Sequence, residues 1–69
     1  MRDPNRIPRI IETLSRLWQA HPDMRLAQII VTAGNLSGAS DDNMYNVEDE
    51  DLEAGMQRYL GILRDASRL

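Results

Sequence analysis

Residues 7–18, IPRIIETLSRLW, carry large apolar side chains at the spacing of an amphipathic helix. The spacing of i, i+3, i+4 and i+7 places these side chains on one face of a helix with 3.6 residues per turn. They are Ile7, Ile10, Ile11, Leu14, Leu17 and Trp18. Asp3 before Pro4 is typical of a helix start and His21-Pro22 of an end, which predicts a helix over about 5–20.

Two further helices are predicted downstream. Leu26, Ile29, Ile30 and Ala33 indicate a short helix over about 24–33, with Asp23 as its N-cap and Gly34 as its C-terminal stop. The stretch 34–43, GNLSGASDDN, is rich in turn-forming residues and predicts a long loop. A short extended segment is expected at 44–47.

The third helix is expected over about 48–67, after Asn46 as a cap. Its apolar stripe consists of Leu52, Met56, Tyr59, Leu60 and Leu63. The chain 1–69 is therefore expected to be one all-α domain: three helices, with a long loop between the second and the third. The expected core contains Ile7, Ile10, Ile11, Leu14, Leu17, Trp18, Leu26, Ile29, Ile30, Met44, Leu52, Met56, Tyr59, Leu60 and Leu63.

Composition restricts the class of protein. The 69 residues include no cysteine, which excludes disulfides and thiolate metal sites. No apolar run approaches the roughly 20 residues needed to span a bilayer. The N-terminal MRDPNRIP is charged and leads into no apolar signal core, so we expect a cytoplasmic protein without a secretory signal.

Charge is distributed unevenly along the chain. Residues 34–57 contain seven acids and no arginine, whereas residues 1–33 contain five arginines against three acids. The densest block is NVEDEDLE at 46–53. Clustered carboxylates repel one another, so their charge should be offset by a cation.

Three interpretations of the acidic block stay open. Its acids can pair with Arg2, Arg6, Arg9 and Arg16, which recur near one flank of the first helix. They can instead face a basic protein partner. A divalent metal site is the weakest alternative, because the block lacks the glycine turn of a calcium loop. The candidate partner-binding residues are Asp41, Asp42, Tyr45, Glu48, Asp49, Glu50, Asp51 and Glu53.

Catalytic chemistry is not expected. His21 stands alone in a turn with no nucleophile beside it, and the serines lie in no elbow motif. We therefore expect no enzyme, no cofactor and no metal. The favoured function is a small protein-binding module that uses its acidic face, and that can also form a homodimer.

Two other functions remain possible from the sequence. One is a phage- or prophage-encoded inhibitor of the anti-CRISPR type, whose carboxylates imitate a phosphate backbone and block a nucleic-acid-binding complex. The other is a small DNA-binding regulator that uses Arg2, Arg6, Arg9 and Arg16. Direct nucleic-acid binding is disfavoured, because it needs a basic face and the sequence pI is near 4.9.

Three segments of the chain share a signature with known proteins. They are RDPNRI at 2–7, a tryptophan followed by PDMRLAQI, and YNVEDEDL at 45–52. With these segments the chain resembles a family of small bacterial and phage proteins of unknown function, over about three-quarters of its length. Ala27 stands where that family has glycine. The resemblance implies architectural roles for Arg2, Asp3, Arg6, Asp23, Arg25, Gln28, Glu48 and Asp49, and supplies no activity.

Overall fold

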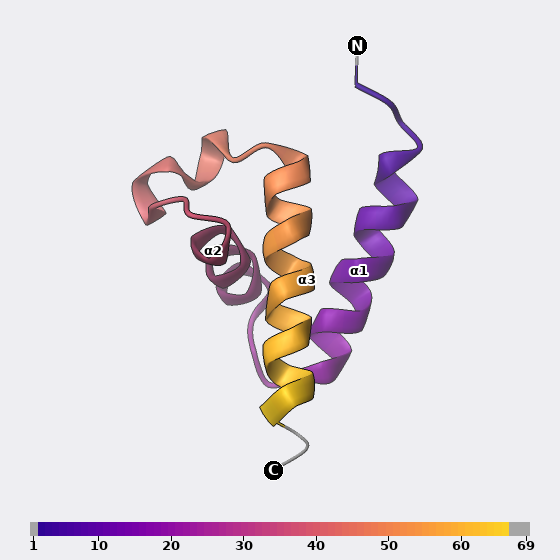
Figure 1. Ribbon diagram of the computed structural model, residues 1–69, viewed down its shortest axis with the longest axis vertical. Coiled ribbons are helices and arrows are strands. Elements are labelled where there is room, and N and C mark those ends of the chain that lie inside the picture. Colours follow the sequence, from indigo (N-terminus) through magenta and orange to yellow (C-terminus); the bar gives the residue numbers. More distant parts are fainter. Residues whose placement is uncertain (1, 67–69) are drawn as a thin grey trace.

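The computed structural model describes residues 2–66, and this part of the chain contains helices and no strand. The elements are α1 (Arg6–Ala20), α2 (Leu26–Leu36), a short 3-10 helix η1 (Asp41–Asn46) and α3 (Asp49–Ala66) (Figure 1). The all-α class is confirmed. The expected long loop is shorter, because α2 continues to Leu36 and η1 replaces the expected extended segment at 44–47.

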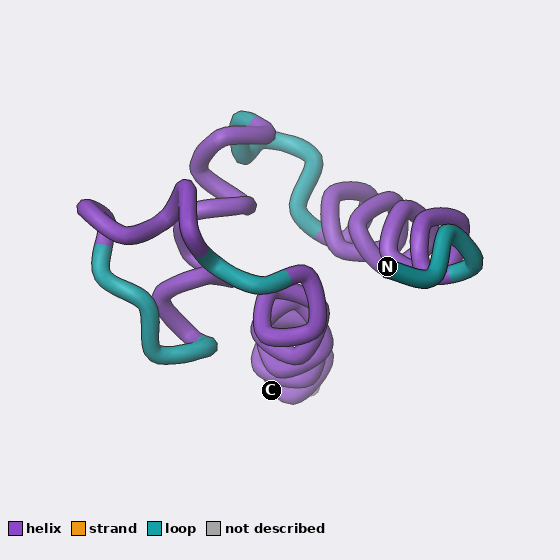
Figure 2. Tube along the Cα trace, turned by 90° about the horizontal axis from the view of Figure 1, so that it is seen from above, coloured by secondary structure: helices purple, strands orange, loops and turns teal. Residues whose placement is uncertain are grey.

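Helix α3 is the element against which both longer neighbours pack. Figure 2 looks along α3, with α1 on one side and α2 with η1 on the other. Helices α1 and α3 run side by side in the same direction, whereas α2 is seen almost end-on in Figure 1 and crosses them. The acidic N-terminal turn of α3 therefore lies beside the arginine-rich N-terminal turn of α1.

The core lies where the three helices meet. Leu17 of α1, Ile29 of α2 and Met56 of α3 are fully buried, and Ala33 and Tyr59 complete the cluster. Burying one such large side chain contributes about 1.5–3 kcal/mol before conformational entropy is subtracted. Partly buried residues surround them: Ile10, Leu14, Met24, Ile30, Leu36, Leu52, Leu60 and Leu63.

Four residues of the expected core are instead exposed: Ile7, Ile11, Trp18 and Leu26. The apolar stripe of α1 is wider than the single face that α3 covers, so its outer members stay in contact with solvent. Trp18 still satisfies its polar atom, since the indole N–H donates to the Met24 carbonyl oxygen at 2.9 Å. Met44 is half-buried rather than part of the central cluster.

The expected helix caps were wrong in three places. Helix α2 starts after Arg25, whose backbone N–H donates to Gln28 Oε1 at 2.9 Å, so Asp23 is not its cap. Gly34 is a buried helical residue rather than a stop. The chain reverses at Gly38, whose φ of 101° lies in the left-handed region. Asn46 belongs to η1, and α3 begins at Asp49.

Two glycines permit close packing around α2. A Cβ on Gly55 of α3 would overlap the carbonyl oxygen of Ala33, so these two helices approach at backbone distance. A Cβ on Gly34 would overlap the Met44 thioether, which anchors η1 on α2. Only the first of these neighbours is rigid backbone, so Gly55 is the stricter requirement.

We predict that Gly55→Ala destabilises the protein although alanine favours helices. The added methyl group forces α2 and α3 apart, and overpacking of this kind costs about 1–3 kcal/mol. Gly61→Ala is the matched control, because nothing lies within 4 Å of its Cβ position. That variant should gain up to about 1 kcal/mol from helix propensity. Urea unfolding followed by circular dichroism measures both, and equal effects would contradict the close contact.

Candidate functional site

Polar side chains join α1 and α3 in a regular series along their parallel axes. Arg6 Nε donates to Asp49 Oδ2 at 2.7 Å, and Arg9 donates to both oxygens of Glu53 at 2.6 and 3.0 Å. One turn further on, Gln57 Nε2 donates to Thr13 Oγ1 at 3.4 Å. The paired residues are 43 or 44 positions apart. This constant offset fixes the register of the two helices.

The residues that precede α1 extend this series. Arg2 donates to Glu48 Oε2 at 3.1 Å, beyond the Arg6–Asp49 pair. Arg6 Nη1 also donates to the Asp3 carbonyl oxygen at 2.8 Å, and Asp3 Oδ1 accepts the Asn5 backbone N–H at 2.9 Å. The segment leading into α1 is thereby held against the first turn of α3.

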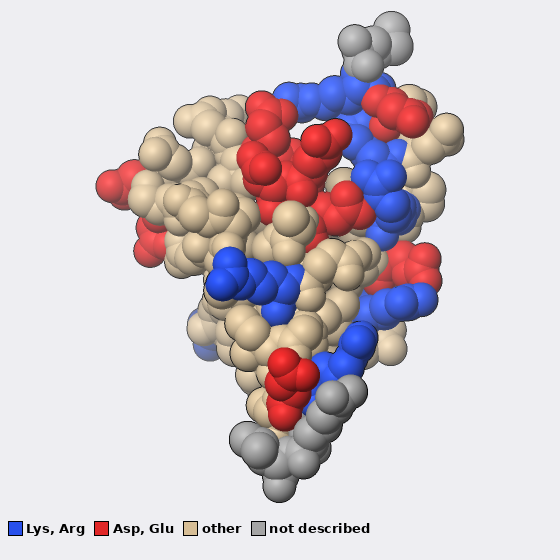
Figure 3. All heavy atoms as spheres, viewed as in Figure 1, with Lys and Arg blue, Asp and Glu red and all other residues tan. Residues whose placement is uncertain are grey.

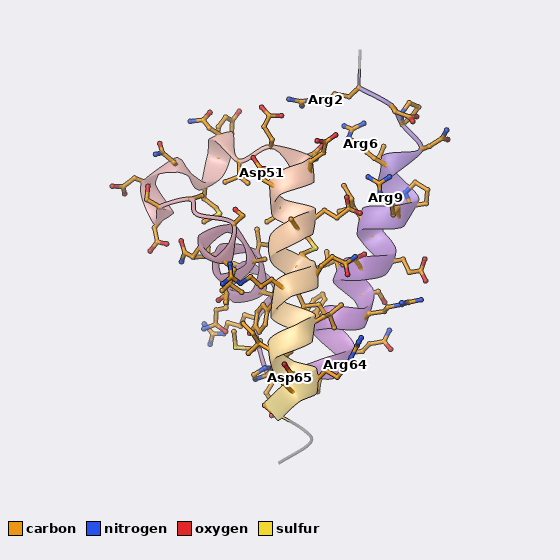
Figure 4. All side chains as sticks on the ribbon, in the orientation of Figure 1. Arg2, Arg6, Arg9, Asp51, Arg64 and Asp65 are labelled. Carbon is orange, nitrogen blue, oxygen red and sulfur yellow. The ribbon has the colours of Figure 1, made fainter. Side chains whose placement is uncertain are left out.

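The sequence placed four arginines near one flank of α1, and three of them reach α3. Figure 4 shows Arg2, Arg6 and Arg9 on the N-terminal part of the chain, beside the start of α3. Arg16 instead pairs with Glu12 at 2.7 Å within α1. The internal arginine–carboxylate network is therefore confirmed for Glu48, Asp49 and Glu53.

Helix dipoles explain why acids of α3 accompany the arginines of α1 where the N-termini of the two helices meet. The positive ends of α1 and α3 lie side by side, and the first turn of α1 holds no acid. The first turn of α3 holds Asp49, Glu50 and Asp51, which offset this positive potential. Arg6, which its own helix dipole disfavours, is then stabilised by Asp49 across the interface.

The Arg6–Asp49 pair changes the titration of the carboxylate. The hydrogen bond from Arg6, reinforced by its charge and by that of Arg2, holds the pKa of Asp49 below its ordinary value of 3.8. In the same way, the hydrogen bond and charge of Glu53 raise the pKa of Arg9. The charged forms of Asp49 and Arg9 are thus favoured by their partners across the interface.

Four candidate acids form no ion pair with the arginines of this network, although Glu50 and Asp51 lie near it. Asp41, Asp42, Glu50 and Asp51 are exposed and make no ion pair within residues 2–66. Figure 3 shows acids gathered over the start of α3 opposite the arginines of α1, with further acids at the η1 end of the molecule. We call Asp41, Asp42, Glu50 and Asp51 together the outer acidic face, which consists of two groups: Asp41 and Asp42 on η1, and Glu50 and Asp51 in the first turn of α3.

Tyr45 lies between these acids in sequence and is 98% exposed. Every other large apolar or aromatic side chain among the described residues keeps a substantial fraction of its surface buried. Its neighbour Met44 is seated against Gly34, so the turn that presents the ring is attached to α2. Tyr45 is one of the candidate partner-binding residues predicted from the sequence, and its ring is accessible to a partner.

A cleft of about 520 Å³ opens between the N-terminal ends of α1 and α3. Its lining consists of Arg2, Asp3, Arg6, Arg9, Glu48, Asp49, Glu50 and Asp51. Pockets for small organic ligands are predominantly apolar with a few polar groups. This cleft has charged walls throughout and matches that description poorly.

Thr13 and Gln57 are contributors that the sequence analysis missed. Thr13 is buried, donates to the Arg9 carbonyl oxygen at 3.2 Å and accepts from Gln57. Its position four residues before Leu17 places both on the face toward α3. The four-residue spacing between Thr13 and Leu17 could therefore have indicated that Thr13 is buried. A polar residue beside an apolar stripe is more readily assigned to the exposed edge of that stripe.

The described part of the chain offers neither a metal-binding cluster nor a membrane-spanning helix. Within residues 2–66, no three histidine, cysteine or acidic side chains are grouped so that they could hold a metal ion. None of the described helices combines the length and the apolar character needed to cross a bilayer.

Comparisons of the chain with protein-family models, with curated proteins and with solved structures find no match. The family resemblance seen in the sequence therefore stays a prediction. The structure places six of its eight signature residues in the polar contacts described above: Arg2, Asp3, Arg6, Gln28, Glu48 and Asp49. The side chains of Asp23 and Arg25 make no hydrogen bond with the other described residues.

We predict that acid weakens the contact between α1 and α3. A carboxylate whose folded pKa is lowered contributes stability above its unfolded pKa, and this contribution is lost as pH falls through the folded value. Unfolding free energy should therefore decrease below about pH 4, and Asp49→Asn should flatten part of this decrease. Urea unfolding at a series of pH values measures both effects.

Glu12→Gln is the control for this titration. It removes a carboxylate that pairs with Arg16 inside one helix, so it leaves the α1–α3 contact intact. The acid profile of Glu12→Gln should follow that of the wild type. An Asp49→Asn profile parallel to the wild type down to about pH 2 would contradict the role of this pair.

Proposed function

We propose that this protein acts by binding another protein through the outer acidic face and Tyr45, without catalysis and without a cofactor. The observation that carries the proposal is the division of the acids into two sets. Glu48, Asp49 and Glu53 are neutralised by arginines of the same chain, whereas the outer acidic face has no such partner among residues 2–66. A basic surface on another protein, in the cytoplasm, would supply the missing cations.

Electrostatics supports a protein partner of this charge. Uncompensated carboxylates raise the energy of the free protein through mutual repulsion, which an approaching cationic surface relieves. Long-range attraction also raises the association rate, and charge pairs at the rim of an interface select against wrong partners. These effects require that the acids stay exposed, which is how the structure presents Asp41, Asp42, Glu50 and Asp51.

Tyr45 supports an anchoring role within the same surface. Tyrosine is enriched among the residues that dominate interface energetics, because its ring buries a large area at low entropic cost. A ring that is 98% exposed contributes little to the stability of its own fold. Arginines that pair with Asp41 or Asp42 could also stack on the ring.

Direct binding to DNA is less well supported. That function would use Arg2, Arg6, Arg9 and Arg16, and each of these guanidinium groups is engaged with a carboxylate of this chain. A DNA phosphate would have to replace a carboxylate as the partner of each arginine. The phosphate would then lie close to the displaced carboxylate, and the two negative charges would repel each other.

We predict that removing three of the four charges of the outer acidic face weakens partner binding and preserves the fold. The triple variant Asp42→Asn, Glu50→Gln and Asp51→Asn removes three exposed carboxylates that make no ion pair among the described residues. Affinity capture from host extract with quantitative mass spectrometry should then recover at least about tenfold less partner, since charge pairs at rims mainly change association rate and selectivity. Circular dichroism should be unchanged.

The matched control is Glu12→Gln, Asp23→Asn and Asp65→Asn, which changes net charge equally at exposed positions elsewhere. Equal loss of capture in both variants would reduce the effect to net charge and contradict a defined surface. Added DNA distinguishes the inhibitor alternative: a captured nucleic-acid-binding protein that DNA displaces would identify the surface as a phosphate mimic.

We also predict that Tyr45→Ser leaves the midpoint of thermal unfolding unchanged, to within about 1 °C, because the ring is fully exposed. The same substitution should weaken capture of the partner by about tenfold or more, as expected for an aromatic anchor. Tyr45→Phe is the conservative control and should keep most of the binding. Undiminished capture by Tyr45→Ser would remove the ring from the interface.

A further inference from the structure

We propose that residues 2–9 form a strap, which ion pairs close over the acidic start of α3 and which competing cations open. This N-terminal strap comprises the segment before α1 and the first turn of α1. When it opens, it uncovers three carboxylates that the closed strap neutralises: those of Glu48, Asp49 and Glu53. The strap exists in the free protein, whereas its opening by a basic partner rests on the proposed function.

Charge, rather than apolar packing, holds the N-terminal strap against α3. None of residues 2–9 is buried, and their one large aliphatic side chain, Ile7, is 53% exposed. Three ion pairs tie the strap to α3, through Arg2, Arg6 and Arg9. The strap carries these three arginines and a single acid, so its net positive charge complements the acids at 48–53. The closed position of the strap therefore depends on those acids.

The rest of α1 is anchored differently. Ile10 packs against the core, Thr13 and Leu17 are buried, and the Trp18 indole N–H donates to the Met24 carbonyl oxygen at 2.9 Å. Burial of apolar surface does not depend on ionic attraction, so this part of the helix should stay in place when the ion pairs break. Helix α1 thus consists of a first turn held by charge and a remainder held by packing.

The ion pairs of the strap are open to solvent. Figure 1 shows α1 leaning away from α3 toward its N-terminal end, where the cleft of about 520 Å³ opens. The side chains of Arg2 and Glu48 are 67% and 64% exposed, and that of Arg9 is 59% exposed. Exposed pairs of this kind contribute little to stability and are screened by salt. The strap can therefore open at a small fraction of the cost of unfolding the whole chain.

A cationic partner reaches the strap through the outer acidic face. The cleft that Arg2, Arg6 and Arg9 line is also lined by Glu50 and Asp51. A basic surface bound to Glu50 and Asp51 therefore brings its cations beside the carboxylates that the strap occupies. Guanidinium and ammonium groups can replace the arginines of the strap as hydrogen-bond donors, so no carboxylate is left unpaired. Opening then adds three carboxylates to the contact.

Amide hydrogen exchange measured by NMR tests the strap in the free protein. In an α-helix the N–H groups of residues 10–13 donate to the carbonyl oxygens of residues 6–9, so their exchange reports opening of the first turn. Exchange at residues 17–20 reports the anchored part of α1. Raising NaCl from about 50 to 500 mM should speed exchange at 10–13 by about three- to tenfold and leave 17–20 unchanged.

Substitution of both acids that hold the first turn should reproduce the effect of salt. Asp49→Asn combined with Glu53→Gln should speed exchange at 10–13 by about tenfold and remove most of its dependence on NaCl. Arg16→Gln is the matched control, because it breaks the Arg16–Glu12 pair inside α1 and leaves the strap closed. Exchange at 10–13 that responds neither to salt nor to the double substitution, or that speeds up equally at 17–20, would overturn the strap. Absence of protection at 10–13 in low salt would do the same.

A hexa-arginine peptide, added at constant ionic strength, tests opening by a cationic partner. Amide shifts at 41–51 should report its binding to the outer acidic face, and exchange at 10–13 should become at least about threefold faster. Binding without faster exchange would overturn the opening by a partner. Absence of shifts at 41–51 would count against the outer acidic face as a cation-binding surface, and thus against the proposed function, whereas the salt series decides the strap by itself.

Discussion

The parallel pairing of α1 with α3 is the constraint on which the arrangement of charge in this protein depends. Three arginine–carboxylate pairs cross the interface, and the paired residues keep an offset of 43 to 46 positions. A slip of one turn that brought Arg6 opposite Glu53 would leave Arg9 opposite Gln57, so fewer ion pairs would form. Each exposed pair contributes at most about 1 kcal/mol, so the pairs select the register rather than provide most of the stability. That stability comes from Leu17, Ile29 and Met56 in the core.

Parallel packing also creates a cost that the acidic block offsets. Two helix N-termini lie side by side, and α1 adds arginines to their positive potential. Asp49 and Glu53 form ion pairs with Arg6 and Arg9. The other carboxylates in the first turn of α3, Glu50 and Asp51, offset the positive end of the helix dipole. The high density of acids at 46–53 therefore has a structural cause for part of its members. Glu50 and Asp51, which act on the dipole, also stay exposed and are available to a second molecule together with Asp41 and Asp42.

The fold is a single layer of three helices with α3 in the middle, and this arrangement leaves part of the apolar surface exposed. Helix α3 packs against α1 on one side and α2 on the other, so a wide apolar stripe on α1 is covered along one edge alone. A small domain buries a lower fraction of its surface than a large one, which leaves apolar side chains such as Ile7 and Ile11 in water. Gly55 strengthens the opposite side, because its missing side chain lets α2 approach at backbone distance.

The sequence by itself determined the three long helices, the absence of disulfides and the concentration of acids at the start of α3. These follow from local rules, since apolar periodicity, turn residues and charge are visible in short windows of the chain. Pairing of the acids with the chain's own arginines was one of three interpretations that the sequence left open, and the sequence did not indicate which acids would pair. The tertiary structure decided that Glu48, Asp49 and Glu53 are paired while Glu50 and Asp51 are not, because this depends on which side of α3 faces α1. It likewise decided that Ile7, Ile11, Trp18 and Leu26 stay exposed and that Gly34 is packed inside a helix. A periodic pattern shows that a helix has an apolar face. How much of that face a neighbouring helix covers is decided only by the packing of the helices.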